Sequence, residues 1–486
     1  MFLSRFDTCS LRSVVLAFAA SHDIPVTIKT TGHSLQGQST GRDTLMIWTR
    51  NLPKYGGITE GNYIDSCGSS VDTVATLKIG GGATWSDAYG AVGADYHLVG
   101  GNCLTVSAAG GWLQGGGLSS TARKYGIGVD NVLSMNVVLS NGTQVVADPC
   151  SEPELFWALR GGGGGTFGVV TSVVYKLHER ENIVLLQFPP GAALAPLGSY
   201  FSFWGGYGSE MHTAFLDFWI EQAPQLDNRW GGYWTSESLH LYFVGSMADA
   251  DATFLDTLRA WADANINIAG DYVSVSEDSS YYDLRGGTVE KIKDPGNTIP
   301  TGPDAEDSNI GSRLVPKQWL LDNPITMRDL LLDMGYVVGY YLGGNSGHVA
   351  TDATAMHPAA RSAIFSIFSM TDETHALVRA TLPNNITGVC YNHHAALEPD
   401  WRNASWGDNY DRLLAAKKVY DPENRLNCWH CVGYIGEEIE QGDSLPEDWG
   451  RYTASPMGEL TADMASKFSI SGLAFAMALS SFMLWV

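Results

Sequence analysis

The sequence is poor in charge, and above all in positive charge. Charged residues make up 17% of the chain, and 29 Lys and Arg stand against 52 Asp and Glu, giving a net charge of −23. Such a surface repels nucleic acid and anionic lipid, so the charge argues against proteins that bind either one through their electrostatic field. The 44% apolar content is that of a globular protein, and 486 residues are enough for two domains of ordinary size.

Cysteine is also scarce, with seven residues in the chain. Should Cys103 serve another purpose, six remain for up to three disulfides, whose pairing does not follow from the sequence. Cys428-Trp429-His430-Cys431 has the spacing of redox and zinc motifs. Because neither a second such pair nor a surrounding strand–helix unit accompanies it, a structural disulfide or free thiols is the favoured interpretation. We expect no metal site.

Glycine, in contrast, is abundant, and its 55 residues concentrate in loops of the first 170 positions. His33 lies in a Thr/Gly/Ser-rich loop directly after the apolar run at 24–28, and Cys103 ends the run Gly100-Gly101-Asn102-Cys103. Glycine lets the backbone approach a ligand closely, often at positive φ, and successive N–H groups in such loops bind anions such as a pyrophosphate. A His and a Cys in separate glycine-rich turns therefore predict a large planar ligand held from two sides, namely a dinucleotide cofactor.

Several ordered motifs extend this pattern along the chain. They are Ile28–Ser34, Cys103–Val106, Tyr125–Val132, Leu155–Arg160 with the glycine run 161–165, Thr166–Val170, Trp406–Tyr410 and Tyr420–Pro422. In order and spacing they resemble the vanillyl-alcohol-oxidase-type FAD proteins, in particular the berberine-bridge-enzyme-like oxidases. The resemblance covers most of residues 10–180 and 385–435, and it is far more specific than a lone glycine motif.

The resemblance implies an α+β fold with a PCMH-type FAD-binding domain in two parts and a substrate domain whose sheet roofs the flavin. The expected organisation is an FAD-binding domain at 1–178, a substrate domain at 179–380, a returning berberine-like segment at 381–440, a linker at 441–467 and a hydrophobic tail at 468–486. Local patterns predict strands at 132–139, 168–175, 239–244 and 362–367, an Asn141-Gly142 hairpin turn, and helices at 155–160, 252–265, 326–334 and 408–418. A polar Pro/Gly loop is expected at 294–312.

The resemblance also assigns cofactor contacts. His33 corresponds to a residue bonded to the flavin 8α-carbon, and Cys103 to one bonded at carbon 6; a neutral imidazole is a good nucleophile for the first bond. Two such links would raise the flavin's redox potential and favour accepting hydride from poorly activated alcohols. The further expected FAD contacts are Gly32, Ser34, Gly37 and Thr105, then Gly110, Gly111, Gly116 and Gly117 near the pyrophosphate and ring, and Asp130, Asn131, Gly168 and Val169 near the adenosine.

A base is needed to take the hydroxyl proton of an alcohol during hydride transfer. Relatives place Tyr or Glu directly after an Asn in the segment that corresponds to Cys390-Tyr391-Asn392-His393, so we expect His393 to be the base and Tyr391 to assist it. Paired surface histidines at His393 and His394 remain an equal alternative. Trp219, Trp230 and Trp234 suit stacking on sugars, although core packing is the expected use of most of them.

The resemblance implies an FAD-dependent oxidase or dehydrogenase that takes hydride from an alcohol or sugar and passes electrons to oxygen, giving hydrogen peroxide. One alternative is oxidative cyclisation or dehydrogenation of a secondary metabolite. The other is a truncated flavin-fold remnant without activity, because the segment 11–20 reads as the domain helix before the flavin loop rather than as a signal peptide. On that interpretation the chain begins inside the domain.

The uncharged stretch 468–486 is long enough to span a bilayer as a helix, and it follows a polar spacer with Ala454-Ser455 upstream. This pattern matches a GPI-anchor signal, and the alternatives are a plain tail anchor in the membrane or an incidental apolar extension. Acceptor sequons at Asn141, Asn385 and Asn403 and the acidic composition weakly favour a secreted or cell-surface glycoprotein.

Overall fold

The computed structural model describes residues 9–34, 36–41, 43–189, 203–266, 272–278, 310–369 and 371–435. The polar loop predicted at 294–312, apart from its last three residues, and the segments 441–467 and 468–486 lie outside these ranges. Within the described ranges, no helix combines the length and apolar character needed to cross a membrane.

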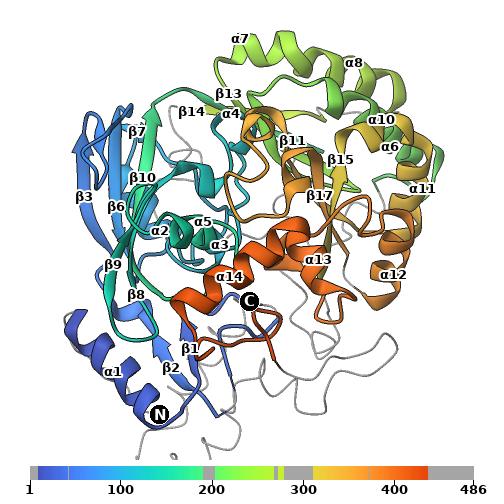
Figure 1. The fold of residues 1–486 in the computed structure, drawn as a ribbon. Helices are drawn as coiled ribbons and strands as arrows, with labels where there is room; N and C mark the ends of the chain where they lie inside the picture. The colour runs from blue at the N-terminus through green and yellow to red at the C-terminus, as the bar shows by residue number, and fades with distance from the viewer. Residues whose placement is uncertain are drawn as a thin grey trace, which may run out of the picture.

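The chain opens with a small α/β unit at the base of the molecule (Figure 1). Helix α1 (Cys9–Ser21) leads into β1 (Val26–Lys29), which pairs in parallel with β2 (Leu45–Trp48). The predicted helix at 11–20 is confirmed, with boundaries shifted by one or two residues, and most of the apolar run at 24–28 lies in β1. The connection between β1 and β2 carries His33, so the loop predicted to hold the cofactor is anchored at both ends by paired strands.

A second sheet has the order β3-β6-β10-β8-β9, with β7 paired to the end of β10. Its strands are β3 (Tyr55–Glu60), β6 (Ala75–Gly80), β7 (Tyr96–His97), β8 (Val132–Val138), β9 (Gln144–Ala147) and β10 (Val169–Glu179). The predicted strands at 132–139 and 168–175 are confirmed, and the Asn141-Gly142 turn joins β8 to β9 with Gly142 at φ +83°. Helices and turns between these strands are α2 (Trp85–Val92), α3 (Gly111–Gln114), α4 (Ala122–Tyr125), η2 (Gly128–Asn131) and α5 (Pro153–Leu159).

A seven-stranded antiparallel sheet, β14-β11-β13-β12-β16-β17-β15, faces the second sheet across the molecule (Figure 1). Its strands are β11 (Ile183–Phe188), β12 (Trp230–Thr235), β13 (Ser238–Val244), β14 (Ser274–Asp278), β15 (Gly311–Pro316), β16 (Val338–Tyr341) and β17 (Ala363–Ser369). Its long hydrophobic runs fit strands that are buried on both faces.

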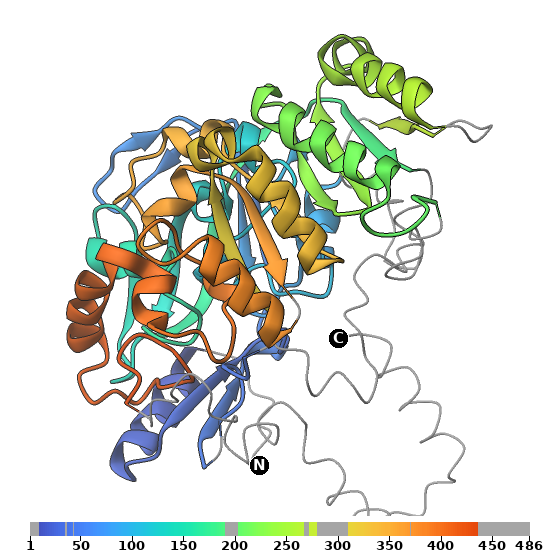
Figure 2. The same ribbon diagram turned by 90° about the vertical axis from the view of Figure 1, so that its right-hand side faces the viewer.

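Helices cover the outer face of this sheet (Figure 2). They are α6 (Glu210–Gln222), α8 (Asp256–Asn265), α10 (Lys317–Asp322), α11 (Pro324–Met334) and α12 (Asp372–Thr381). Trp219, Trp230 and Trp234 are fully buried in the core between helices and sheet, which confirms core packing as their use.

The inner face of the same sheet carries polar and aromatic side chains. Strand alternation and register place His240, Tyr233, Tyr340 and Ser366 in one row across four neighbouring strands, with Phe368 two residues further along β17. Tyr340 and Phe368 pack into the core of the first half of the chain. This face therefore roofs the first half, as the resemblance implies.

After β17 and α12 the chain returns to the first half through η11 (Tyr391–His393), α13 (Trp401–Trp406) and α14 (Tyr410–Tyr420). Helix α14 packs against α5. Two disulfides close loops, Cys67–Cys150 and Cys428–Cys431. Of the two alternatives left open for Cys428 and Cys431, a structural disulfide or free thiols, the structure has the disulfide, while Cys103 and Cys390 carry free thiols.

Candidate functional site

The two predicted attachment residues meet in space through a threonine hydroxyl. His33 lies in the β1–β2 loop, and its Nε2 is 3.0 Å from Thr105 Oγ1. The same hydroxyl lies 3.5 Å from Cys103 Sγ. His33 is exposed and Cys103 half-buried, so both nucleophilic atoms remain open to a ligand. Nearby protein atoms partly desolvate the imidazole and lower the pKa of His33 below 6.5, which favours the neutral, nucleophilic ring at neutral pH.

The glycine loops converge beside this cluster with almost no space between their backbones. A Cβ at Gly110 would lie 2.9 Å from Thr30 Oγ1, and one at Gly164 would lie 2.9 Å from the Cα of Gly111. A Cβ built on Gly111 itself, in contrast, meets no protein atom within 4 Å. Three loops from different parts of the sequence therefore pack closely at one place, and the backbone of Gly111 is exposed there.

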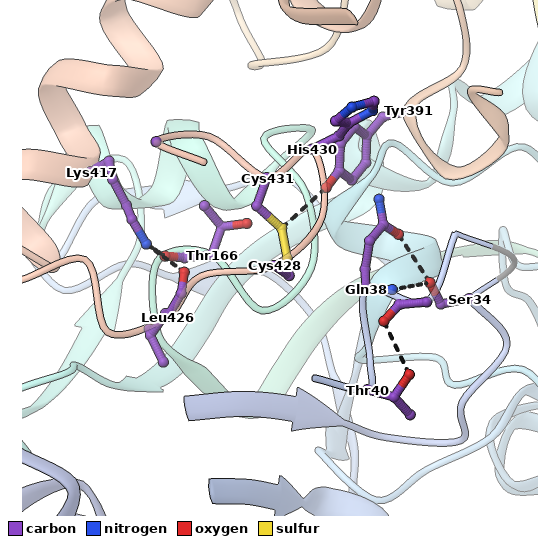
Figure 3. The surroundings of a disulfide bond; sticks show 12 residues. Ser34, Gln38, Thr40, Thr166, Tyr391, Lys417, Leu426, Cys428, His430 and Cys431 are labelled. Carbon is purple, nitrogen blue, oxygen red and sulfur yellow. Dashed lines mark hydrogen bonds between the residues drawn. A yellow bond between two sulfur atoms is a disulfide. The ribbon is translucent and has the colours of Figure 1, made fainter. Parts of the chain in front are cut away.

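The loop that carries His33 is shaped by its own hydrogen bonds. Ser34 Oγ donates to Gln38 Oε1 at 3.1 Å and accepts from the Gln38 amide at 3.0 Å, and Thr40 Oγ1 donates to the carbonyl of Gly37 at 3.1 Å (Figure 3). Gly37 has φ +72° and Gly32 has φ +89°, a conformation that glycine adopts without the penalty a Cβ brings. Gly32 and Gly37 thus bend the chain on either side of Ser34.

Three buried side-chain atoms in these loops have no hydrogen-bond partner among the described residues: Gln36 Oε1, Gln38 Nε2 and Gln114 Oε1. Buried polar atoms are normally satisfied, so their partner is expected to be a polar ligand or water. Together with the exposed backbone at Gly111 and the His33–Cys103 pair, these atoms fit FAD. His33 and Cys103 would hold its ring and the glycine loops its pyrophosphate.

Gly116 and Gly117 continue the glycine loop with φ +124° and +82°. Their carbonyls accept hydrogen bonds from the amides of Val129 and Gly128, at 3.1 and 2.8 Å. These bonds tie the glycine loop to η2, the segment expected near the adenosine.

The residues expected near the adenosine are engaged within the protein. Both carboxylate oxygens of Asp130 accept from Arg361, at 2.7 and 2.8 Å, and this ion pair is buried. Asn131 donates to the Ile127 carbonyl and lies 2.6 Å from His178. Gly168 packs against Val137, where a Cβ would lie 2.5 Å from Cγ1, and the next residue, Val169, is fully buried. Contacts of these four residues with adenosine remain predictions.

The candidate base lies under the seven-stranded sheet. His393 ends η11 and packs edge-on against Phe368 of β17, with ring centres 4.7 Å apart. Its Nδ1 is buried and has no hydrogen-bond partner among the residues that the structure describes. Burial and the neighbouring His394 lower the pKa of His393 to about 4, so the ring is neutral and able to accept a proton at neutral pH.

The second expected residue, Tyr391, points away from bulk solvent. Its hydroxyl lies 3.5 Å from Cys431 Sγ (Figure 3). Its ring packs against Trp406, with ring centres 4.9 Å apart. Burial raises the pKa of the phenol well above its usual 10. A phenol in this setting stays protonated, so its part in proton transfer remains a prediction.

Sequence reasoning missed several residues that shape the site. Thr30 Oγ1 accepts a hydrogen bond from Thr49 Oγ1 at 3.1 Å. The Thr49 hydroxyl also lies 3.1 Å from the carbonyl oxygen of Gly81. A Cβ at Gly82 would lie 2.4 Å from the Leu52 carbonyl oxygen. The run Gly80-Gly81-Gly82 directly after an apolar strand pattern was the available signal.

Comparisons with known proteins agree with this geometry. The FAD binding domain model matches residues 12–148, and the berberine and berberine-like model matches 389–430. A VAO-type flavoprotein oxidase of Thermothelomyces thermophilus is 30% identical over 464 residues, covering 88% of this chain and 75% of that protein. A bifunctional decalin synthase of Penicillium decumbens is 30% identical over 450 residues, covering 86% and 74%.

Solved structures show the same fold. A VAO-type flavoprotein from Myceliophthora thermophila superimposes with a TM-score of 0.69 at 26% identity, covering 88% of this chain and 79% of that one. A glucooligosaccharide oxidase from Acremonium strictum, whose FAD is 6-S-cysteinyl and 8α-N1-histidyl, gives 0.64 at 18% identity, covering 88% and 91%.

The fold and site thus define an FAD-linked oxidoreductase. This chain belongs to the VAO-type flavoprotein family, with a berberine-like C-terminal segment, and it is an enzyme.

Proposed function

We propose that the protein is an oxidase that removes hydride from an alcohol carbon of a small molecule or saccharide, with FAD bonded to both His33 and Cys103. The observation that carries the proposal is the approach of His33 and Cys103 to one hydroxyl, that of Thr105, beside the glycine loops. The doubly linked FAD of the Acremonium strictum oxidase supports the linkage by analogy of residue types. When bound, the flavin supplies the hydride acceptor, and oxygen is the proposed final acceptor.

The side chains of the protein cover the substrate and accept its proton. The inner face of the seven-stranded sheet, with Tyr233, Tyr340 and Phe368, covers the substrate and excludes water from it. His393 holds the hydroxyl proton of the substrate, for which its unpartnered ring nitrogen and neutral state suit it. Hydride leaves carbon only as this proton leaves oxygen, so removing the base slows turnover without removing the cofactor.

A substrate screen tests the proposal. The purified enzyme is incubated with a panel of alcohols, mono- and oligosaccharides, and hydrogen peroxide is measured together with oxygen uptake. A positive substrate is then tested with His393→Ala, for which we expect a fall in kcat of about 10²-fold or more with unchanged flavin content. Wild-type turnover by a fully flavinylated His393→Ala protein would remove His393 from this role.

A second candidate reaction is oxidative ring closure or dehydrogenation of a secondary metabolite. The 30% identity to the Penicillium decumbens decalin synthase favours it. Absence of peroxide with every alcohol and saccharide, combined with anaerobic bleaching of the flavin by a polyene or polyketide extract, would favour this reaction over the first.

A further inference from the structure

Two loops contact the short segment that carries His393. One is the loop closed by the Cys428–Cys431 disulfide, and the other is the loop that carries His33. The imidazole of His393 contacts Phe368, and within the described part of the chain its Nδ1 has no hydrogen bond, so the backbone at 391–396 sets its position. Whatever fixes this backbone therefore fixes the candidate base.

The disulfide loop contacts this segment at three points. Trp429 Nε1 donates to the Ala396 carbonyl at 3.2 Å, and Tyr391 Oη lies 3.5 Å from Cys431 Sγ. The third contact joins two imidazoles, with His430 Nδ1 3.2 Å from His394 Nε2 (the ring of His430 is labelled in Figure 3).

The hydrogen-bond geometry sets the protons of the two imidazoles. His394 Nδ1 is 2.8 Å from the Tyr391 carbonyl, which accepts only, so this nitrogen carries the proton. His394 Nε2 is then the acceptor, and His430 Nδ1–H donates to it. The two rings form a hydrogen-bond chain from His430 to His394 to the Tyr391 carbonyl, and this chain requires a neutral His394, because protonation of its Nε2 would remove the acceptor.

His430 is itself fixed in place. Its ring stacks on Trp401 with centres 4.6 Å apart and planes 7° apart, and its backbone has φ +50° inside the four-residue disulfide turn. The Cys431 amide closes that turn on the Cys428 carbonyl at 3.1 Å. The side chain of His430 therefore projects from a rigid support toward the segment of His393.

The second loop that contacts the segment of His393 is the loop that carries His33. Gln36, three residues after His33, donates from Nε2 to the His394 carbonyl at 2.7 Å in a buried position. The His394 carbonyl thus connects the segment of the candidate base to the loop that carries His33. The ring of His394 connects the same segment to the disulfide loop.

We propose that His394 and His430 are positioning residues that, clamped by the Cys428–Cys431 disulfide, hold His393 at a fixed place relative to the flavin attachment loop. This inference rests on the proposed function of His393. A misplacement of a base by about 1 Å costs up to about 10²-fold in rate, so the brace is expected to act on kcat and to leave substrate affinity and flavin binding nearly unchanged.

The test uses two substitutions matched in backbone preference. Glycine and asparagine both tolerate φ +50°, but only asparagine retains a side-chain N–H near the position of Nδ1. His430→Gly is expected to lower kcat about tenfold, with KM and covalent flavin near wild-type values, and His430→Asn to recover most of that loss. Hydrogen–deuterium exchange of the peptide 391–396, which needs no turnover, is expected to be faster in His430→Gly and near wild-type in His430→Asn.

Equal kcat values in wild type and His430→Gly, or equal losses in the glycine and asparagine variants, would overturn the inference. Should His430→Gly fail to fold, Trp429→Phe removes the N–H that donates to Ala396 and keeps a smaller aromatic ring beside His430. A several-fold fall in kcat with faster exchange at 391–396 would support the brace, and no change in either would overturn it.

His393→Ala separates this inference from the proposed function. Full turnover by that variant would show that His393 is not the base and would refute the proposed function of His393. An inactive His393→Ala beside a fully active His430→Gly would refute the brace alone.

Discussion

At the scale of single residues, the Thr105 hydroxyl is the link between the two attachment residues. It contacts His33 Nε2 and Cys103 Sγ, at 3.0 and 3.5 Å, and so orients both nucleophiles. Thr105→Val keeps the shape of the side chain and removes the hydroxyl. We expect covalent flavin attachment to slow about tenfold, the equivalent of one hydrogen bond, in a time course of acid-stable flavin after adding FAD to apoprotein. Thr105→Ser is the control, and equal rates for all three proteins would contradict the assigned orientation.

The pH dependence of turnover should report His393. Its pKa is lowered to about 4 by burial and by His394, so the base is neutral above that pH and protonated below it. We therefore expect kcat/KM to be level from neutral pH down to about pH 5 and to fall tenfold per unit below about pH 4. His393→Gln should lack this acid limb in its residual activity. A limb near pH 6.5 in the wild type would show that the ring is solvated during catalysis.

At the scale of elements, helix α14 is anchored by a fully buried ion pair. Lys417 Nζ donates to Asp421 Oδ2 at 2.7 Å and to the carbonyls of Thr166 and Leu426 at 2.8 and 2.6 Å (Figure 3). Lys417→Met leaves the buried Asp421 carboxylate with two backbone N–H donors but without its counter-ion, which is expected to cost about 3 kcal/mol of unfolding free energy. Lys418→Met, one residue on and exposed, should change it by less than about 0.5 kcal/mol. Denaturant unfolding measures both, and equal effects would contradict the anchoring role.

The same helix shows what the sequence predicts and what it does not. Local pattern predicted a helix at 408–418, and the structure has η12 (Gly407–Asn409) followed by α14. The partners of Lys417 at Thr166 and Leu426 carry no local signal, because one is 251 residues away and both offer only backbone oxygen. Strands separated by turn residues, and helices that begin at a Pro or a capping residue, could be predicted from the sequence because their signals are local.

At the scale of the whole molecule, arginine side chains of each half bind groups in the other half. Arg361 of the second half pairs with Asp130 in the first, and Arg123 of the first donates to the Leu226 and Leu342 carbonyls in the second. The sequence marked Asp130 as a cofactor residue by resemblance, but the ion pair with Arg361 spans 231 positions and has no local pattern. The glycine loops and His33 could be predicted as cofactor contacts because the signal lies in short motifs, whereas the contacts of His430 are tertiary and have no local pattern.

Buried neutral histidines should make the folded state sensitive to acid. Burial lowers the pKa of His97 to about 3, of His178, His357 and His394 to about 4, and of His430 to about 2. Unfolded histidines titrate near 6.5, so between pH 6.5 and about 4 the unfolded chain binds more protons and stability falls as pH falls. We expect Tm to decline steadily across this window in buffers of constant ionic strength. A Tm that stays level or rises would mean that these rings are solvated.

The most direct test of the central claim is whether the flavin is bonded to both residues. The full-length protein is precipitated with acid, and the flavin absorbance of pellet and supernatant is recorded for wild type, His33→Ala and Cys103→Ala. Double attachment predicts that all colour stays with the wild-type pellet and that each single variant still retains flavin in its pellet. Flavin released entirely into the wild-type supernatant would contradict covalent attachment through either residue.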